Sequence, residues 1–262
     1  MAAPHASRVG EVLSADIAVP EHERELLFYS RVLTTGDNPL WREDLMNNAG
    51  TPIIGLGERS PAYADLPLQW MPHIQVADVA GSVERALGRG GRELMHHKDD
   101  RGQSQWAVLL DPNGAAFGII PVVTSQATQP VSEGLPPDSV GRIAWLDLTV
   151  SNAPATRDFY QDVVGWSVQD VQMEDTSGRY ADYALCTPDG TAVAGVCHAR
   201  GVNRGLPPVW LIYLPVGDLG QSLGRVREGG GEVLDARKGS GGEYAFAVVR
   251  DPVGACVALV PG

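Results

Sequence analysis

The order of apolar and polar positions in the second half of the chain repeats one pattern twice. Residues 142–150 alternate as a half-buried strand does, and residues 153–164 place apolar side chains at helical spacing. Three strand-like segments follow, at 166–173, 180–185 and 191–197. After residue 208 the pattern starts again with a strand, a helix over 219–228 and three strands. Each stretch therefore predicts a βαβββ unit.

The first half of the chain carries the same pattern, with helices expected over 23–33 and 80–88. Four anchors recur in one order: Asp16, Phe28, Trp70 and Asp111 return as Asp147, Phe159, Trp210 and Asp251. The first two anchors return after 131 positions and the last two after 140. A period this long indicates two similar domains rather than a solenoid of short repeats. We expect a first domain at 1–122, a linker at 123–139 and a second domain at 140–262.

Composition narrows the classes of partner. The net charge of −12 argues against nucleic acid and against an anionic membrane surface. No stretch approaches the roughly 18 apolar residues of a membrane-spanning helix, and no apolar export segment opens the chain. The three cysteines have no Cys-x-x-Cys spacing, which favours reduced thiols. We expect a cytoplasmic monomer or homodimer.

Two short motifs accompany the βαβββ pattern: Phe-Tyr-x-x-Val in the first helix of each repeat and Asp-Pro-x-Gly before its last strand. Together they resemble the vicinal oxygen chelate superfamily, which includes glyoxalase I, extradiol dioxygenases, fosfomycin-resistance enzymes and bleomycin-binding proteins. The resemblance covers about 10–122 and 140–262. It implies an α+β fold in which four βαβββ units form two domains, each a curved mixed β-sheet. A shared fold does not fix the activity.

The resemblance also locates the positions at which metal-dependent members hold a divalent ion. Carried over to this chain, they are Ser14, Met71, Trp145, Leu211, Gly118 and Ala258. None of these residues offers a carboxylate, imidazole or thiolate, the donors that such ions need. We therefore expect no metal and no cofactor. The pair His96-His97 is interpreted as part of a solvated loop.

Alternation along the strands brings polar residues to the same side as those positions. Asp16 is in step with Ser14, and Asp147 with Trp145; His73 follows Met71 and Tyr213 follows Leu211 in the same way. We expect Asp16 with His73, and Asp147 with Tyr213, to act as acid–base pairs in partly desolvated surroundings. The alternative is structural: each Asp bonds a neighbouring strand or an Arg, and His73 is a cavity-wall residue.

Six Trp against four Phe favours a large apolar ligand. We expect Trp41 and Trp145 to contact it, together with Ser14, Met71, Leu211 and Gly118, and we assign Trp70 and Trp210 to packing.

Two functions remain open. The first is a metal-independent enzyme that dehydrates, cyclises or epimerises an aromatic or polyketide-like molecule by acid–base catalysis, with Asp16 as its main group. The second is a protein that sequesters a hydrophobic aromatic antibiotic without catalysis. Asp16→Asn separates them, because the change keeps the shape and removes the proton transfer.

Overall fold

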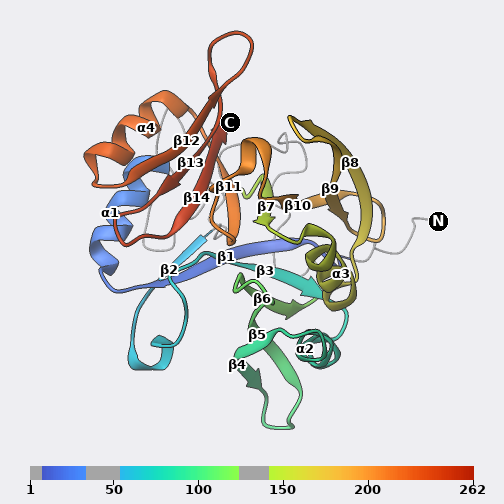
Figure 1. Ribbon diagram of the computed structural model, residues 1–262. Coiled ribbons are helices and arrows are strands. Elements are labelled where there is room, and N and C mark those ends of the chain that lie inside the picture. Colours follow the sequence, from blue (N-terminus) through green and yellow to red (C-terminus); the bar gives the residue numbers. More distant parts are fainter. Residues whose placement is uncertain (1–7, 34–53, 124–141) are drawn as a thin grey trace, which may run out of the picture. The chain divides into compact units, whose positions relative to one another are not determined.

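The computed structural model describes residues 8–33, 54–123 and 142–262 (Figure 1). The first repeat contains β1 (Val12–Val19), α1 (His22–Leu33), β2 (Ile54–Glu58), β3 (Met71–Val76), α2 (Val79–Gly88), β4 (Arg92–Lys98), β5 (Ser104–Leu110) and β6 (Ala116–Pro121). The second contains β7 (Trp145–Val150), α3 (Ala153–Val164), β8 (Ser167–Asp175), β9 (Gly178–Cys186), β10 (Ala192–His198), β11 (Trp210–Val216), α4 (Leu219–Glu228), β12 (Glu232–Lys238), β13 (Tyr244–Arg250) and β14 (Cys256–Pro261). Short 3₁₀ turns lie at Pro61–Tyr63 and Gly201–Asn203.

The predicted α+β fold is confirmed. All strands and helices expected in the second half are present, and the two helices expected in the first half are α1 and α2. Strands β1–β6 belong to one mixed sheet and β7–β14 to another. One expectation was wrong: His96 and His97 lie within strand β4 rather than in a loop. None of the helices in the described ranges is long and apolar enough to cross a membrane.

Local signals explain where the helices begin and end. The side chain of Asn152 caps α3 by accepting a hydrogen bond from the Ala155 amide, and Gly165 ends the helix with a φ of 90°. Asp218 caps α4 through the Gln221 amide. Asp78 and Asp218, which are 140 positions apart, both stand at the N-cap position of their helices.

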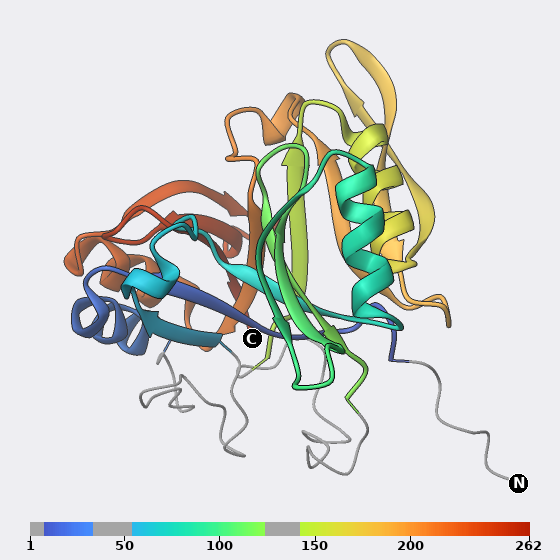
Figure 2. The same cartoon turned by 90° about the horizontal axis from the view of Figure 1, so that it is seen from below.

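Strand pairing follows one scheme. The first strand of a unit pairs in parallel with the last, as β3 does with β6, β7 with β10 and β11 with β14. The remaining neighbours are antiparallel, β4–β5–β6 and β12–β13–β14 being examples. Helix α2 packs across β4, β5 and β6, and Figure 2 shows it along one side of these strands.

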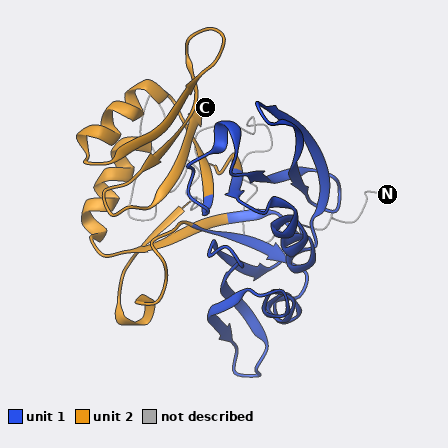
Figure 3. Ribbon diagram, viewed as in Figure 1, with its two compact units in different colours: residues 1–13, 71–124, 146–210 blue, residues 14–70, 125–145, 211–262 orange. Residues whose placement is uncertain are grey.

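Contacts divide the chain into two compact units, each assembled from both repeats (Figure 3). Unit 1 comprises 1–13, 71–124 and 146–210, and unit 2 comprises 14–70, 125–145 and 211–262. In unit 1, α2 packs on α3 and Ser82 Oγ donates a 2.7 Å hydrogen bond to the Val163 carbonyl. In unit 2, α1 packs on α4 and Ser222 Oγ bonds the Val32 carbonyl at 2.7 Å. The predicted sequence domains and linker remain predictions.

The recurring anchors form a buried hydrogen-bonded chain in each unit. In unit 2, Trp70 Nε1 donates to the Tyr29 hydroxyl at 3.0 Å, and Tyr29 donates to Asp251 at 2.8 Å. In unit 1, Trp210 Nε1 donates to Tyr160 at 2.8 Å, and Tyr160 is bonded to Asp111. Trp70 and Trp210 are fully buried, as their assignment to packing requires.

Candidate functional site

One face of strands β3–β6 points away from the helices of unit 1. On β6, the Phe117 ring packs against Phe159 and Tyr160 of α3, with centroids 6.1 and 5.2 Å apart. Because side chains alternate along a strand, the next residue, Gly118, faces the other way. The His73 ring lies directly over Gly118, since a Cβ at position 118 would stand 2.4 Å from His73 Cδ2. We call the side that carries His73 the His73 face of β3–β6.

The His73 face also carries an aromatic stack on its outer strands. Trp106 on β5 is paired with His97 on β4, and their rings stack with centroids 5.6 Å apart and an interplanar angle of 20°. Val108, two residues beyond Trp106, is opposite Gly118, so the stack shares the side of His73. The Trp106 ring is half-buried, which leaves part of its surface available to a ligand.

Strands β11–β14 in unit 2 repeat this arrangement with different chemistry. The Arg237 guanidinium lies 5.0 Å over the Phe246 ring, and Asp235 accepts from Arg237 Nε at 2.9 Å. The Phe246 ring lies 6.3 Å from Tyr213. His97 and Arg237 are 140 positions apart, as are Trp106 and Phe246. Both repeats therefore present a cationic or imidazole group stacked on an aromatic ring.

Sequence reasoning did not select these stacks, because the paired residues differ in identity between the repeats. The signal that finds them is the constant offset of 140 positions, combined with the alternation of each strand. Stacked rings that keep one side exposed are a common way to hold planar ligands.

Each of the two predicted acids is in register with a glycine on the neighbouring strand. Asp16 on β1 is paired with Gly55 on β2, and a Cβ at position 55 would stand 2.4 Å from Asp16 Oδ1. Asp147 on β7 is paired with Gly195 on β10 in the same way. Both carboxylates are half-buried. At Asp16, the absence of a side chain at position 55 gives the carboxylate room to lie along the sheet.

Asp147 also has a neighbour that sequence reasoning missed. Its Oδ1 lies 4.0 Å from Cys197 Sγ. Burial raises the pKa of the Cys197 thiol well above its usual range, and the negative charges of Asp147 and Asp182 raise it further. The thiol therefore stays protonated near neutral pH and does not supply a thiolate nucleophile there.

A second pair beside Cys197 was also missed. Asp182 is buried, and its Oδ1 accepts from the His198 backbone amide at 2.8 Å and lies 2.9 Å from His198 Nδ1. No sequence signal brings these two residues together, because only the pairing of β9 with β10 makes them neighbours.

The predicted acid–base pairs are placed as follows. Asp16 and Tyr213 belong to unit 2, whereas His73 and Asp147 belong to unit 1. The members of each predicted pair thus fall in different compact units, and the pairing remains a prediction. Trp41 lies outside the described residues, so its ligand contact also remains a prediction.

The family's metal positions do not fit a metal in this chain. Met71, Leu211, Gly118 and Ala258 are buried, and Ser14 and Trp145 are half-buried. At Gly118, the space that a ligating side chain would need is filled by the His73 ring. Within 8–33, 54–123 and 142–262, no group of three or more His, Cys, Asp or Glu is arranged to hold an ion.

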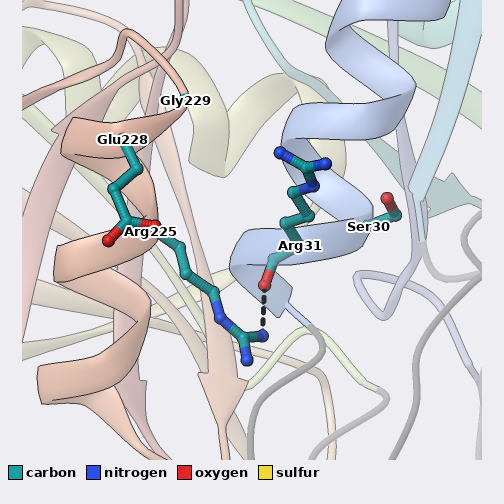
Figure 4. A pocket seen from close by; sticks show the side chains of 5 residues that line it. All are labelled: Ser30, Arg31, Arg225, Glu228 and Gly229. Atoms are coloured by element: carbon teal, nitrogen blue, oxygen red, sulfur yellow. Dashed lines mark hydrogen bonds between the residues drawn. The ribbon is translucent and has the colours of Figure 1, made fainter.

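A cavity of about 450 Å³ lies elsewhere in unit 2, at the C-terminal ends of α1 and α4 (Figure 4). It is lined by Ser30, Arg31, Arg225, Glu228 and Gly229. Arg225 Nη1 donates to the Arg31 carbonyl at 2.8 Å, so this guanidinium caps a helix end. Helix C-termini carry partial negative charge and disfavour anions, and we assign the cavity no chemistry.

Comparison with known families matches both repeats. Residues 142–259 match the family described as Glyoxalase/Bleomycin resistance protein/Dioxygenase superfamily, and residues 13–120 match the Glyoxalase-like domain. The variant homoprotocatechuate 2,3-dioxygenase of Brevibacterium fuscum, solved with HPCA, has a TM-score of 0.57 at 14% identity, covering 98% of this chain and 72% of that one. This likeness concerns the fold alone.

Two curated relatives are more similar in sequence. The putative glyoxylase CFP32 of Mycobacterium tuberculosis is 31% identical over 116 residues, 44% of this chain and 43% of that protein. The anthracycline biosynthesis protein DnrV of Streptomyces peucetius is 28% identical over 169 residues, 64% of this chain and 57% of DnrV. The chain spans about half the length of the curated relatives that it matches.

Proposed function

Because this chain belongs to the glyoxalase/bleomycin resistance/dioxygenase superfamily, we propose that it is a metal-independent enzyme of natural-product metabolism acting on a bulky aromatic molecule. The observation that carries the proposal is the pair of stacks, His97 on Trp106 and Arg237 on Phe246, at equivalent places in the two repeats. They offer flat, partly exposed surfaces to a planar ligand. The similarity to DnrV supports a ligand of the aromatic natural-product class.

The proposed chemistry is proton transfer. A carboxylate such as Asp16 removes a proton from a carbon next to a carbonyl of the ligand. A protonated side chain of the same unit then returns a proton to that carbon, or to a departing hydroxyl. Dehydration, cyclisation and epimerisation need only such a positioned acid and base in a pocket that excludes water. The donor set at the six metal positions supports a route without a metal ion.

The test begins with a metabolite extract of the host, from which compounds that the protein retains or converts are identified by mass spectrometry. Asp16→Asn should abolish conversion while the affinity for the retained compound stays within about tenfold, because the amide keeps the shape of the side chain but cannot accept the proton. Asp147→Asn makes the same change at the equivalent position of the second repeat and tests whether the second predicted carboxylate also takes part. Unchanged conversion by both variants would contradict acid–base catalysis by these residues.

Metal independence has a separate test. We expect less than one equivalent of transition metal per chain after purification, and conversion that survives dialysis against EDTA. A stoichiometric ion whose removal abolishes conversion would overturn this part of the proposal.

Sequestration of an aromatic antibiotic is the second candidate. It is favoured by the presence of a stack in both repeats, since a binding protein can use two similar faces. Under this alternative no compound of the extract is converted, Asp16→Asn leaves affinity unchanged, and removal of Trp106 or Phe246 weakens binding.

A further inference from the structure

Gly118 has a specific consequence for His73. In a parallel pair, residues in register lie side by side, and β3 and β6 place His73 beside Gly118. A Cβ at position 118 would stand 2.4 Å from His73 Cδ2, 3.1 Å from Nε2 and 3.4 Å from Cγ. Two of these distances are shorter than ordinary van der Waals contact, and the first is not tolerated. The imidazole can lie flat on β6 only because position 118 has no side chain.

The equivalent position in the second repeat supports this interpretation. There Tyr213 is paired with Ala258, which does carry a methyl group. An alanine is therefore compatible with the strand at this point, and the glycine at 118 is required by the ring beside it rather than by the backbone. The backbone itself gives no reason for glycine, since Gly118 is absent from the glycines with positive φ in the described residues.

Asp16 also lies against a glycine of the neighbouring strand. Asp16 is in register with Gly55, and a Cβ at position 55 would stand 2.4 Å from Asp16 Oδ1. Both glycines thus leave space that is filled by the polar side chain of the neighbouring strand. Position 118 is also the one at which metal-dependent members of the family are expected to carry a carboxylate ligand.

We propose that Gly118 is a positioning residue. It leaves empty the space that a metal-binding side chain would fill, and the His73 imidazole occupies that space. There the ring hydrogen-bonds a hydroxyl of the aromatic molecule that the protein binds. The placement of the ring follows from the register of β3 with β6 and from the close approach of His73 to Gly118, whereas the role toward a ligand rests on the proposed function. Gly118 acts only through His73 and touches no ligand itself.

The first experiment needs no ligand. Nuclear Overhauser contacts between the His73 ring and the Gly118 α-protons should be present in the wild-type protein and absent in Gly118→Ala. Urea unfolding should show that Gly118→Ala is destabilised and that the double variant His73→Ala/Gly118→Ala recovers part of the loss. Ala258→Gly, the matched change in the second repeat, should leave the His73 contacts intact. Gly118→Ala and His73→Ala with additive effects on unfolding would overturn the placement, even if Gly118→Ala alone folds poorly.

The second experiment uses two probes of one shape, 2-naphthol and 2-methoxynaphthalene, of which only the first can donate a hydrogen bond. The wild type should prefer 2-naphthol, and Gly118→Ala should lower that preference by about tenfold or more, because a displaced ring no longer meets the hydroxyl. A general loss of structure would weaken both probes equally. Absence of probe binding by the wild type would count against the proposed function and against the ligand role of His73, while the first experiment still judges the placement. An unchanged preference in Gly118→Ala would overturn the positioning role.

Discussion

The Tyr29 hydroxyl donates a 2.8 Å hydrogen bond to Asp251, which lies 222 positions later in the chain. The donor belongs to the first repeat and the acceptor to the second. Tyr160 and Asp111 form the reciprocal link, in which the donor belongs to the second repeat and the acceptor to the first. The motif residues that reveal the duplication are therefore the same residues that join the two copies.

Loss of the Tyr29 hydroxyl should destabilise the protein. Tyr29→Phe leaves Trp70 Nε1 and Asp251 without this partner in a buried site, which costs about 1–3 kcal/mol. Tyr160→Phe makes the matched change in unit 1 and should cost a similar amount. Urea unfolding measures both free energies. If neither variant differs from the wild type, the buried chains do not stabilise the fold.

Glu25 gives unit 2 a stability that depends on pH. The residue is fully buried beside the Asp251 carboxyl, and neither of its oxygens accepts a hydrogen bond from a donor group in the described residues. Burial, and then the negative charge of Asp251, raise the pKa of Glu25 from 4.5 to about 8. The folded state therefore holds a proton that the unfolded state releases, so stability should fall as pH rises from about 4.5 to about 8. The free energy of unfolding, measured across this range, should decline in the wild type and vary less in Glu25→Gln.

Unit 1 shows which residue pair could replace this buried carboxyl. At the equivalent positions of unit 1, Asn113 Nδ2 donates to Thr156 Oγ1 at 2.9 Å, whereas unit 2 has Val253 and Glu25. Glu25→Thr/Val253→Asn transfers the satisfied pair to unit 2. The double variant should be more stable than the wild type at pH 8. Equal pH dependence in the wild type and in both Glu25 variants would show that Glu25 is ionised in the folded protein.

The stacked rings should dominate the binding of planar probes. Trp106→Ala and Phe246→Ala each remove one stack, and we expect each to weaken 2-naphthol binding by a free energy of about 1 kcal/mol or more at its own face. Leu87→Ala removes an exposed apolar side chain of a helix and is the control. Fluorescence titration gives the affinities. Weakening by the control equal to that of the two variants would indicate non-specific adsorption.

Cys197 should react slowly with alkylating reagents. Its raised pKa lowers the fraction of thiolate, which is the reactive form. At pH 8 we expect iodoacetamide to modify Cys197 more slowly than it modifies glutathione. Asp147→Asn removes one of the charges that raise the pKa and should accelerate the reaction, as peptide mass spectrometry can follow. If Asp147→Asn reacts no faster than the wild type, the charge of Asp147 does not raise the pKa of the Cys197 thiol.

The sequence predicts the elements well because period and capping are local properties. Helix α4 begins and ends where expected, since Asp218 and the glycines at 229–231 mark its ends. The sequence does not predict which residues the motifs contact. Tyr29 contacts an Asp-Pro-x-Gly turn, but both repeats contain that turn, and residue identity does not say which copy is used. The positions of His73 and Asp16 over glycines depend on strand register, which becomes visible only when the sheet is assembled.

The exchange of Tyr and Asp partners also bears on how such a protein can be divided. A polypeptide broken within 123–139 would yield two fragments, neither of which contains a complete Trp–Tyr–Asp chain. Each fragment on its own would bury a tyrosine hydroxyl without its carboxylate acceptor, so the two are expected to recombine rather than to fold independently. Each repeat of this chain thus supplies the other with the carboxylate that its buried tyrosine needs, as two subunits of a dimer could do for each other.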